Sequence, residues 1–271
     1  MSGRRRGQGT EVDSEDRATR LFFELFDGLP RQGPGDTTST LRALEFVPGV
    51  GSETRVLDLG CGTGAQTLVL ARSSPAHILA IDSHPPFIDL LNREIHRSGL
   101  ADRVEARVAD MCRLDLEDAS FDLIWSEGAI YNVGVESGLR DWRRLLRPGG
   151  YVAFTEACWR KPDPPAACVA FWEREYPAIR DTAALLEAID GCGFETMGHF
   201  PLPASAWWED YYRPLQANVT AFRQRHKGET DAQELADSAQ TEIDIWHAYA
   251  EFYGYEFFVV RAAPHDIARA T

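Results

Sequence analysis

The chain has 271 residues and a formal charge of −14, from 28 Lys and Arg against 42 Asp and Glu. Its composition, 44% hydrophobic and 26% charged, is typical of globular proteins, and no apolar run is long enough for a membrane span. The acidic balance and the lack of a basic stripe longer than Arg4–Arg6 argue against nucleic acid as a partner. The five scattered cysteines show no metal-binding spacing, and no export signal is evident. We therefore expect a cytoplasmic enzyme or binding protein without a metal, a disulfide framework or a membrane segment.

The first 50 residues predict a tail followed by two helices. Residues 1–16 are Gly, Arg, Ser and acidic residues, which favour a disordered tail. Apolar residues at helical spacing predict a helix from residue 17 that Pro30 ends. After a Gly- and Pro-containing loop, residues 37–47 predict a second helix with a Thr or Ser cap. Residues 17–50 thus form a predicted N-terminal helical cap.

From residue 54 the pattern alternates between strands and helices. The strands are predicted over residues 54–60, 77–82, 103–110, 121–127 and 151–157, and the helices over residues 65–73, 85–99 and 136–150. Such alternation requires right-handed crossovers and a mostly parallel sheet. With the strands described next, the fold class is α/β, a Rossmann-like, seven-stranded, mostly parallel sheet with helices on both faces.

The last third of the chain interrupts this alternation. Residues 181–193 predict a helix and residues 194–203 a strand, and the closing strand is residues 255–262. Between these strands, residues 204–254 have a helical, aromatic-rich pattern. We predict that this segment is a helical insertion before the last strand, over one end of the sheet. Residues 17–271 then form one domain.

The most informative segment is the sequence VLDLGCGTGAQT, residues 56–67. A buried strand leads into three glycines at G-x-G-x-G spacing, and a helix follows at once. Ligands in open α/β sheets bind beyond the carboxyl ends of the strands, where glycines let backbone approach the ligand. The dinucleotide fingerprint G-x-G-x-x-G is one residue longer. This difference weakens the interpretation that the chain is a nicotinamide-dependent oxidoreductase, which stays as an alternative.

Residues 56–64 resemble motif I of the class I S-adenosylmethionine-dependent methyltransferases. The resemblance extends over residues 54–157, with a carboxylate at the end of the second strand, Asp-Met after the third strand, and FDLIWSEGAIY at the fourth. It implies S-adenosylmethionine as the cofactor, with the methionine end at the glycine turn, the ribose at Asp82 and the adenine at Asp110 and Met111. The implied cofactor-binding residues are Asp58, Gly60, Cys61, Gly62, Thr63, Gly64, Gln66, Asp82, Ser83, Asp110, Met111 and Ser126.

Three further segments resemble one bacterial subfamily of small-molecule methyltransferases, of the type 11 or 25 kind. These are RQGPG, SEGAIYNVG and FYGYEFF. SEGAIY stands where many amino-group and nucleic-acid methylating enzymes have an Asn-Pro-Pro-Tyr-like signature. This departure argues against methylation of bases or glutamine by their mechanism, and leaves the acceptor open.

A methyl acceptor that is protonated at neutral pH needs a general base. The candidates are Glu127 and Glu156, which follow the fourth strand or lie in the fifth, with Tyr131 as a residue that positions the acceptor. The alternative for Glu127 is a structural partner of a backbone amide or of the N-terminal cap. Packed structural roles are also open for Glu156 and Tyr131.

Aromatic residues of the insertion could enclose an apolar or cationic acceptor through cation–π contacts, or form only its own core. The candidate acceptor-binding residues are Trp159, Trp207 and Tyr211. We therefore expect transfer of a methyl group to N or O of a small-molecule acceptor by a monomer or homodimer. A donor-binding module without turnover, and a protein or RNA methyltransferase, stay as alternatives.

Overall fold

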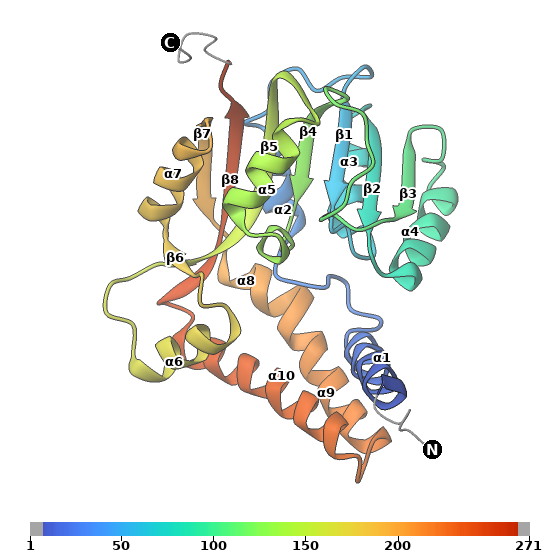
Figure 1. The fold of residues 1–271 in the computed structure, drawn as a ribbon, viewed down its shortest axis with the longest axis vertical. Helices are drawn as coiled ribbons and strands as arrows, with labels where there is room; N and C mark the ends of the chain where they lie inside the picture. The colour runs from blue at the N-terminus through green and yellow to red at the C-terminus, as the bar shows by residue number, and fades with distance from the viewer. Residues whose placement is uncertain (1–7, 265–271) are drawn as a thin grey trace, which may run out of the picture.

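The computed structural model describes residues 8–264, with side chains from residue 17 onward. An eight-stranded sheet runs in the order β3-β2-β1-β4-β5-β8-β7, and β6 pairs with β5 off this path (Figure 1). The strands pair in parallel except for β8, which is antiparallel to both β5 and β7. The predicted α/β fold class is therefore confirmed, and the additional strand is the two-residue β6. The strands are β1 (Arg55–Leu59), β2 (His77–Asp82), β3 (Val104–Val108), β4 (Phe121–Ser126), β5 (Leu146–Trp159), β6 (Arg180–Asp181), β7 (Phe194–Pro201) and β8 (Tyr253–Ala262).

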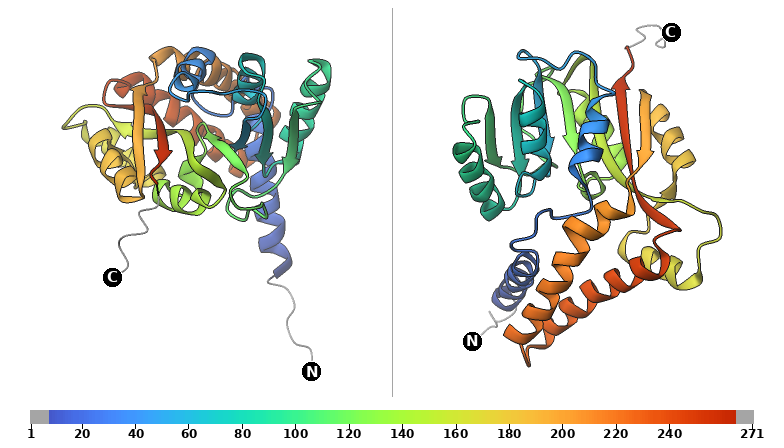
Figure 2. Two further views of the ribbon diagram at one scale, coloured as in Figure 1. Left: turned by 90° about the horizontal axis from the view of Figure 1, so that it is seen from above. Right: turned by 180° about the vertical axis from the view of Figure 1, so that it is seen from behind.

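Helices cover both faces of the sheet, and a third group lies beyond the edge where the parallel strands end (Figures 1 and 2). One face carries α2 (Thr37–Leu44), α3 (Ala65–Ser73) and α4 (Pro85–Arg97). The other face carries α5 (Val135–Arg143) and α7 (Thr182–Gly191). The third group contains α1 (Gln8–Leu25), α6 (Ala166–Glu175), α8 (Ala204–Trp207), the π-helical turn η2 (Trp208–Tyr212), α9 (Arg213–Arg225) and α10 (Thr230–Tyr249), and a 3-10 turn, η1 (Ile130–Asn132), follows β4.

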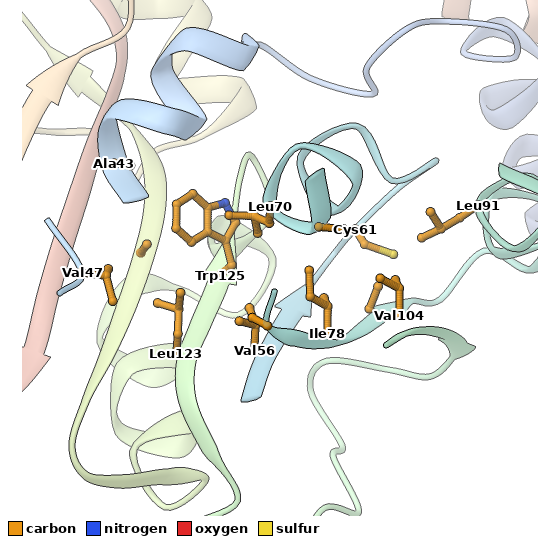
Figure 3. Packing of buried hydrophobic residues seen from close by; sticks show 14 of the residues in the cluster. Ala43, Val47, Val56, Cys61, Leu70, Ile78, Leu91, Val104, Leu123 and Trp125 are labelled. Carbon is orange, nitrogen blue, oxygen red and sulfur yellow. The ribbon is translucent and has the colours of Figure 1, made fainter. Parts of the chain in front are cut away.

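Burial of alternate faces of each strand explains the layers. Trp125 and Leu123 of β4 point toward α2 and α3, beside Val56 of β1 and Ile78 of β2 (Figure 3). Trp125 and Leu123 have no exposed surface. Strand residues of opposite parity face α5 and α7 instead, as expected for the two-residue period of a strand. Both faces of the sheet are thus buried. A ligand can therefore reach the sheet at the carboxyl ends of its parallel strands.

Three local predictions differ from the structure. Helix α1 begins at Gln8, so residues 8–16 of the predicted tail are helical, whereas residues 1–7 lie outside the described residues. Extending an existing helix requires no new nucleation, which explains why a polar segment joins it. The cap of α2 is Asp36, whose carboxylate accepts from the Ser39 amide at 2.9 Å, not a Thr or Ser. The fifth helix ends at Arg143, and β5 includes the Pro-Gly-Gly turn predicted to close that helix.

The third group of helices has a core of its own, in which α1 packs against α9 and α10. Arg17 of α1 pairs with Asp231 and Glu229 at the start of α10. Asn218 of α9 donates to the carbonyl oxygens that end α1, those of Leu25 and Asp27, both at 2.9 Å. The N-terminal helix is therefore fixed to the insertion and covers the sheet edge with it. In the part of the chain that the structure describes, no helix has the length and apolarity needed to cross a membrane.

Candidate active site

The glycine turn between β1 and α3 requires glycine for conformation and for space. Gly60, Gly62 and Gly64 have φ of +72°, +54° and +89°, values that other residues rarely adopt. A Cβ atom on Gly60 would lie 2.3 Å from the Cβ of Ala129, and one on Gly64 would lie 2.2 Å from a methyl group of Leu91. The amides of Gly60 and Cys61 both donate to the carbonyl of Ile81, at 2.9 and 3.0 Å. The turn is therefore held tightly against β2.

Asp58 lies under this turn and does not reach its outer surface. The carboxylate is fully buried and accepts from Thr67 at 2.5 Å and from Gln66 at 3.2 Å. Burial raises its pKa to about 7, although the bonds from Thr67 and Gln66 lower it in part. Asp58 therefore acts by holding the start of α3 and the side chain of Gln66.

Two further carboxylates lie at the ends of neighbouring strands. Asp82 ends β2 and accepts from the amides of Gly62 and His84, both at 2.9 Å. Asp110 follows β3 and accepts from the Cys112 amide at 2.8 Å, which holds the pKa of Asp110 below its usual value. Both side chains retain free lone pairs, so each can accept hydrogen bonds from a ligand.

These groups line one cavity of about 360 Å³, which we call the donor cavity. The predicted residues that line it are Gly60, Cys61, Gly62, Gln66, Asp82, Ser83, Asp110, Met111, Glu127 and Tyr131. Four predicted cofactor-binding residues do not line it: Asp58, Thr63, Gly64 and Ser126. Ser126 is buried and donates to the Leu59 carbonyl at 3.0 Å, so it joins β4 to β1. Thr63 and Gly64 belong to the turn itself, and Asp58 and Ser126 are buried in the strands beside it.

The donor cavity also has walls that the sequence analysis did not place there. Arg31, Gln32, Gly33 and Pro34 line it from the loop before α2, as do Phe22 and Phe23 of α1. The Oε1 atom of Gln32 accepts from the amide and the hydroxyl of Thr63, at 3.1 and 3.0 Å. The RQGPG segment was the available signal, because it carried part of the subfamily resemblance. Its attachment to the glycine turn depends on the tertiary fold.

Glu127 is already engaged by the protein on both carboxylate oxygens. Oε2 pairs with Arg31 at 2.9 Å, and Oε1 accepts from Thr40 at 2.7 Å and from the indole of Trp125 at 2.9 Å. The side chains of Arg31 and Glu127 are only 8% and 3% exposed. This geometry favours the structural alternative for Glu127, in which it anchors the N-terminal loop to β4.

A second cavity of about 230 Å³, the acceptor chamber, adjoins the donor cavity. The two share the lining residues Phe22, Gln32, Gly33, Pro34, Gly128 and Tyr131. The remaining lining residues of the acceptor chamber are Phe26, Glu156, Ala157, Phe171, Trp172, Glu175, Tyr176, Trp207, Tyr211, Glu242 and Tyr255. The structure thus brings Glu156, Tyr131, Trp207 and Tyr211 together. Trp159 instead lines a different cavity beside Lys161.

Glu156 differs from Glu127 in having an unused oxygen. It is 3% exposed, its Oε1 accepts from the Ala157 amide at 2.9 Å, and its Oε2 has no hydrogen-bond partner. Burial raises its pKa to about 7, although the hydrogen bond from the Ala157 amide lowers it in part. A buried carboxyl group near neutral pKa that lines a cavity is typical of a functional acid or base.

The sequence is also similar to known proteins. Residues 57–154 match the family model of a methyltransferase domain. Phosphoethanolamine N-methyltransferase 3 of Arabidopsis thaliana is 30% identical over 182 residues, which are 66% of this chain and 35% of that protein. The chain spans about a third of the length of the first curated relatives it matches.

Solved structures resemble nearly the whole chain. A methyltransferase from Geobacter sulfurreducens in complex with S-adenosyl-L-homocysteine has a TM-score of 0.76 at 22% identity, covering 91% of this chain and 98% of its own. The cyclase SpnF has a TM-score of 0.73 at 21% identity, covering 93% and 94%. These likenesses establish the fold, which one of the two proteins uses as a methyltransferase and the other as a cyclase.

Proposed function

We propose that the chain is a class I S-adenosylmethionine-dependent methyltransferase and that it transfers a methyl group to N or O of a small molecule in the acceptor chamber. One observation carries this proposal. The acceptor chamber shares six lining residues with the donor cavity, so a molecule in one meets a molecule in the other. A donor and an acceptor held side by side are what direct methyl transfer requires.

The residues of the donor cavity fit S-adenosylmethionine. A Cβ on Gly60 would lie 2.8 Å from the end of Met111, so only glycine leaves this wall its present shape. Asp82 would accept from the ribose hydroxyls, and Asp110 from the adenine amino group. Phe22 and Phe23 of α1 add aromatic surface to the lining of the cavity. The same cavity contains no second glycine-rich phosphate site that would favour a dinucleotide.

When bound, S-adenosylmethionine supplies a methyl group on a sulfonium, a leaving group that is already activated. The task of the chain is therefore mainly alignment, which is worth up to ~7–11 kcal/mol of the barrier. Tyr131 lines both cavities and packs edge-on against Tyr176, with ring centroids 6.0 Å apart. We infer that Tyr131 orients the acceptor against the donor and that Glu156 accepts its proton when the acceptor carries one.

The size of the acceptor chamber supports a small acceptor. A cavity of about 230 Å³ walled by the insertion and by α1 has no room for a nucleic-acid strand. A side chain of a protein could still enter through its mouth. Relatives of this chain include enzymes named for phosphoethanolamine, a small molecule, which also supports a small acceptor.

The deciding experiment combines a binding and a turnover measurement on the full chain. Calorimetry should show S-adenosylhomocysteine binding, whereas NADH should not bind. Purified protein with isotope-labelled donor and a metabolite extract should then yield a labelled small molecule, identified by mass. Asp82→Ala, prepared in parallel, should bind S-adenosylhomocysteine more weakly and yield less labelled product. Donor binding without any labelled product would instead indicate a binding module, and a labelled protein or RNA would overturn the small-molecule acceptor.

A further inference from the structure

The lining of the acceptor chamber is acidic. Among its lining residues are three glutamates, Glu156, Glu175 and Glu242, and none of those residues is Lys, Arg or His. Glu175 is exposed and pairs with Arg174 at 2.7 Å, and Glu242 accepts from Tyr212 at 2.9 Å. Glu156 alone combines deep burial with an oxygen that has no partner. A buried carboxylate without a partner is costly, so its site favours a ligand that supplies one.

Most of the other residues that line the acceptor chamber are aromatic. Trp207 packs edge-on against Tyr255, with ring centroids 4.8 Å apart, and Phe26 lies against Tyr211 at 6.4 Å. Aromatic faces beside carboxylates attract cations, because the ring quadrupole and the negative charge act in the same direction. The indole N–H groups of Trp172 and Trp207 also lack partners. Both side chains line the chamber.

The only cationic side chain that lines either of the two cavities is Arg31. Its Nη1 atom is bound to Glu127 in a buried pair. Within these described linings, no free cation remains for a phosphate or a carboxylate group of an acceptor. The charge of the chamber therefore favours a cationic acceptor over an anionic one, and the fold alone does not indicate this preference.

We propose that the acceptor is a small amine that is positively charged in water, and that Glu156 binds its nitrogen and removes a proton from it. This inference rests on the proposed methyltransferase function and narrows its acceptor from N or O to an amine. The aromatic wall accommodates an apolar body, and the carboxylates of Glu156 and Glu242 bind the ammonium end.

The proton transfer is required because an ammonium nitrogen has no lone pair. One N–H bond breaks, its proton passes to the Oε2 atom of Glu156, and its electron pair stays on nitrogen as a lone pair. This lone pair forms the new C–N bond while the C–S pair returns to the sulfur of the donor. The positive charge moves from sulfur to nitrogen, and the proton on Glu156 leaves to water. The chamber thus begins and ends each cycle with a cation beside a carboxylate.

The test uses three probes of the same shape and different charge. These are 2-phenylethylamine, 2-phenylethanol and 3-phenylpropionate, titrated by calorimetry into the full chain saturated with S-adenosylhomocysteine at about pH 8. We expect the amine to bind about tenfold more tightly than the alcohol, and the acid to bind least, because only the amine forms a charge-assisted bond. Equal or tighter binding of the alcohol or the acid would overturn the inference.

Variants assign the preference to Glu156. Glu156→Gln should reduce the preference for the amine over the alcohol to about threefold or less, with the affinity for S-adenosylhomocysteine unchanged within about twofold. Glu173→Gln is the control, since Glu173 lies exposed on α6 and does not line the chamber. If Glu156→Gln does not fold, Glu242→Gln serves instead and should lower the preference by about threefold. A preference that survives in the folded variant would exclude its glutamate from the site.

The outcome also separates this inference from the proposed function. If wild-type protein does not bind S-adenosylhomocysteine, the methyltransferase function fails. If it binds this compound and methylates an alcohol or acid from the extract, that function stands and the amine inference is wrong. Mass analysis of a methylated nitrogen in the labelled product would support both.

Discussion

The buried pair of Arg31 and Glu127 provides a direct test of how the N-terminal loop is held on the donor cavity. The two side chains are almost inaccessible to solvent, and their charged atoms are 2.9 Å apart. Removing one partner of such a pair leaves a buried charge uncompensated, which typically costs ~3–5 kcal/mol. Because Thr40 and Trp125 still donate to Glu127, we expect Arg31→Met to lower the free energy of unfolding by about 3 kcal/mol.

Glu127→Gln should cost a similar amount, because it leaves Arg31 buried without its carboxylate. The double variant Arg31→Met with Glu127→Gln has no buried charge at this place. Its loss should therefore be smaller than the sum of the two single losses by about 1–3 kcal/mol. The matched control is Arg147→Met, which breaks an ion pair to Asp122 whose side chains are 41% and 34% exposed. A pair exposed to this degree contributes about 0–1 kcal/mol.

Urea denaturation, followed by tryptophan fluorescence, measures these differences, and calorimetry with S-adenosylhomocysteine measures their effect on the donor cavity. Arg31 and Gln32 are adjacent, and Gln32 is bound to Thr63 of the glycine turn. We therefore expect both single variants to bind the compound more weakly than Arg147→Met does. Additive losses of stability, or a loss for Arg31→Met no larger than that of the control, would refute the role of this pair.

Three further variants test the donor side. Asp82→Ala should weaken S-adenosylhomocysteine binding by ~1.5–3 kcal/mol in calorimetry, because it removes charge-assisted bonds to the ribose, and an unchanged affinity would contradict the assignment. Gly64→Ala should lower the free energy of unfolding, measured by urea denaturation, by about 2–4 kcal/mol. Alanine at this position would combine a φ of +89° with a contact of 2.2 Å between its Cβ and Leu91. A loss no larger than that of a substitution at an exposed position would argue against this need for glycine. Burial raises the pKa of Asp58 from 3.8 to about 7, so the folded chain keeps a proton that the unfolded chain releases, and stability should fall by about 1.4 kcal/mol for each pH unit between about pH 4 and 7. Asp58→Asn should make the decline shallower by this amount and leave the contribution of Glu156, whose pKa is also raised to about 7. An unchanged slope in the variant would assign the decline to other groups.

The cofactor-binding half of the molecule was predictable because its signals are local. Buried strands such as residues 77–82 and the helix over residues 65–73 have the predicted bounds. The three glycines marked the turn where backbone can approach a ligand, and their positive φ angles give a further reason for glycine there. Asp82 and Asp110 could be placed at one edge, because parallel strands bring their carboxyl ends together.

The helical insertion shows where local signals end. Its helical pattern is visible in the sequence, but the sequence does not indicate which of its aromatic residues face a cavity. Trp207 lines the acceptor chamber, whereas Trp159, a comparable candidate, lies in β5 beside β8 and faces another cavity. The difference follows from the packing of α8 and η2 over the sheet edge, which involves contacts between distant segments.

The different roles of Glu127 and Glu156 also depend on the tertiary structure. In the sequence both are glutamates that follow or end a buried strand, and nothing nearby distinguishes a base from a structural anchor. The partners of Glu127 come from Arg31 and Thr40, which are 96 and 87 residues away along the chain. Glu156 has no such partner for its second oxygen and lines a chamber instead. Backbone geometry and strand order depend on neighbouring residues and are encoded locally, whereas the availability of a carboxylate depends on which distant donors folding brings to it.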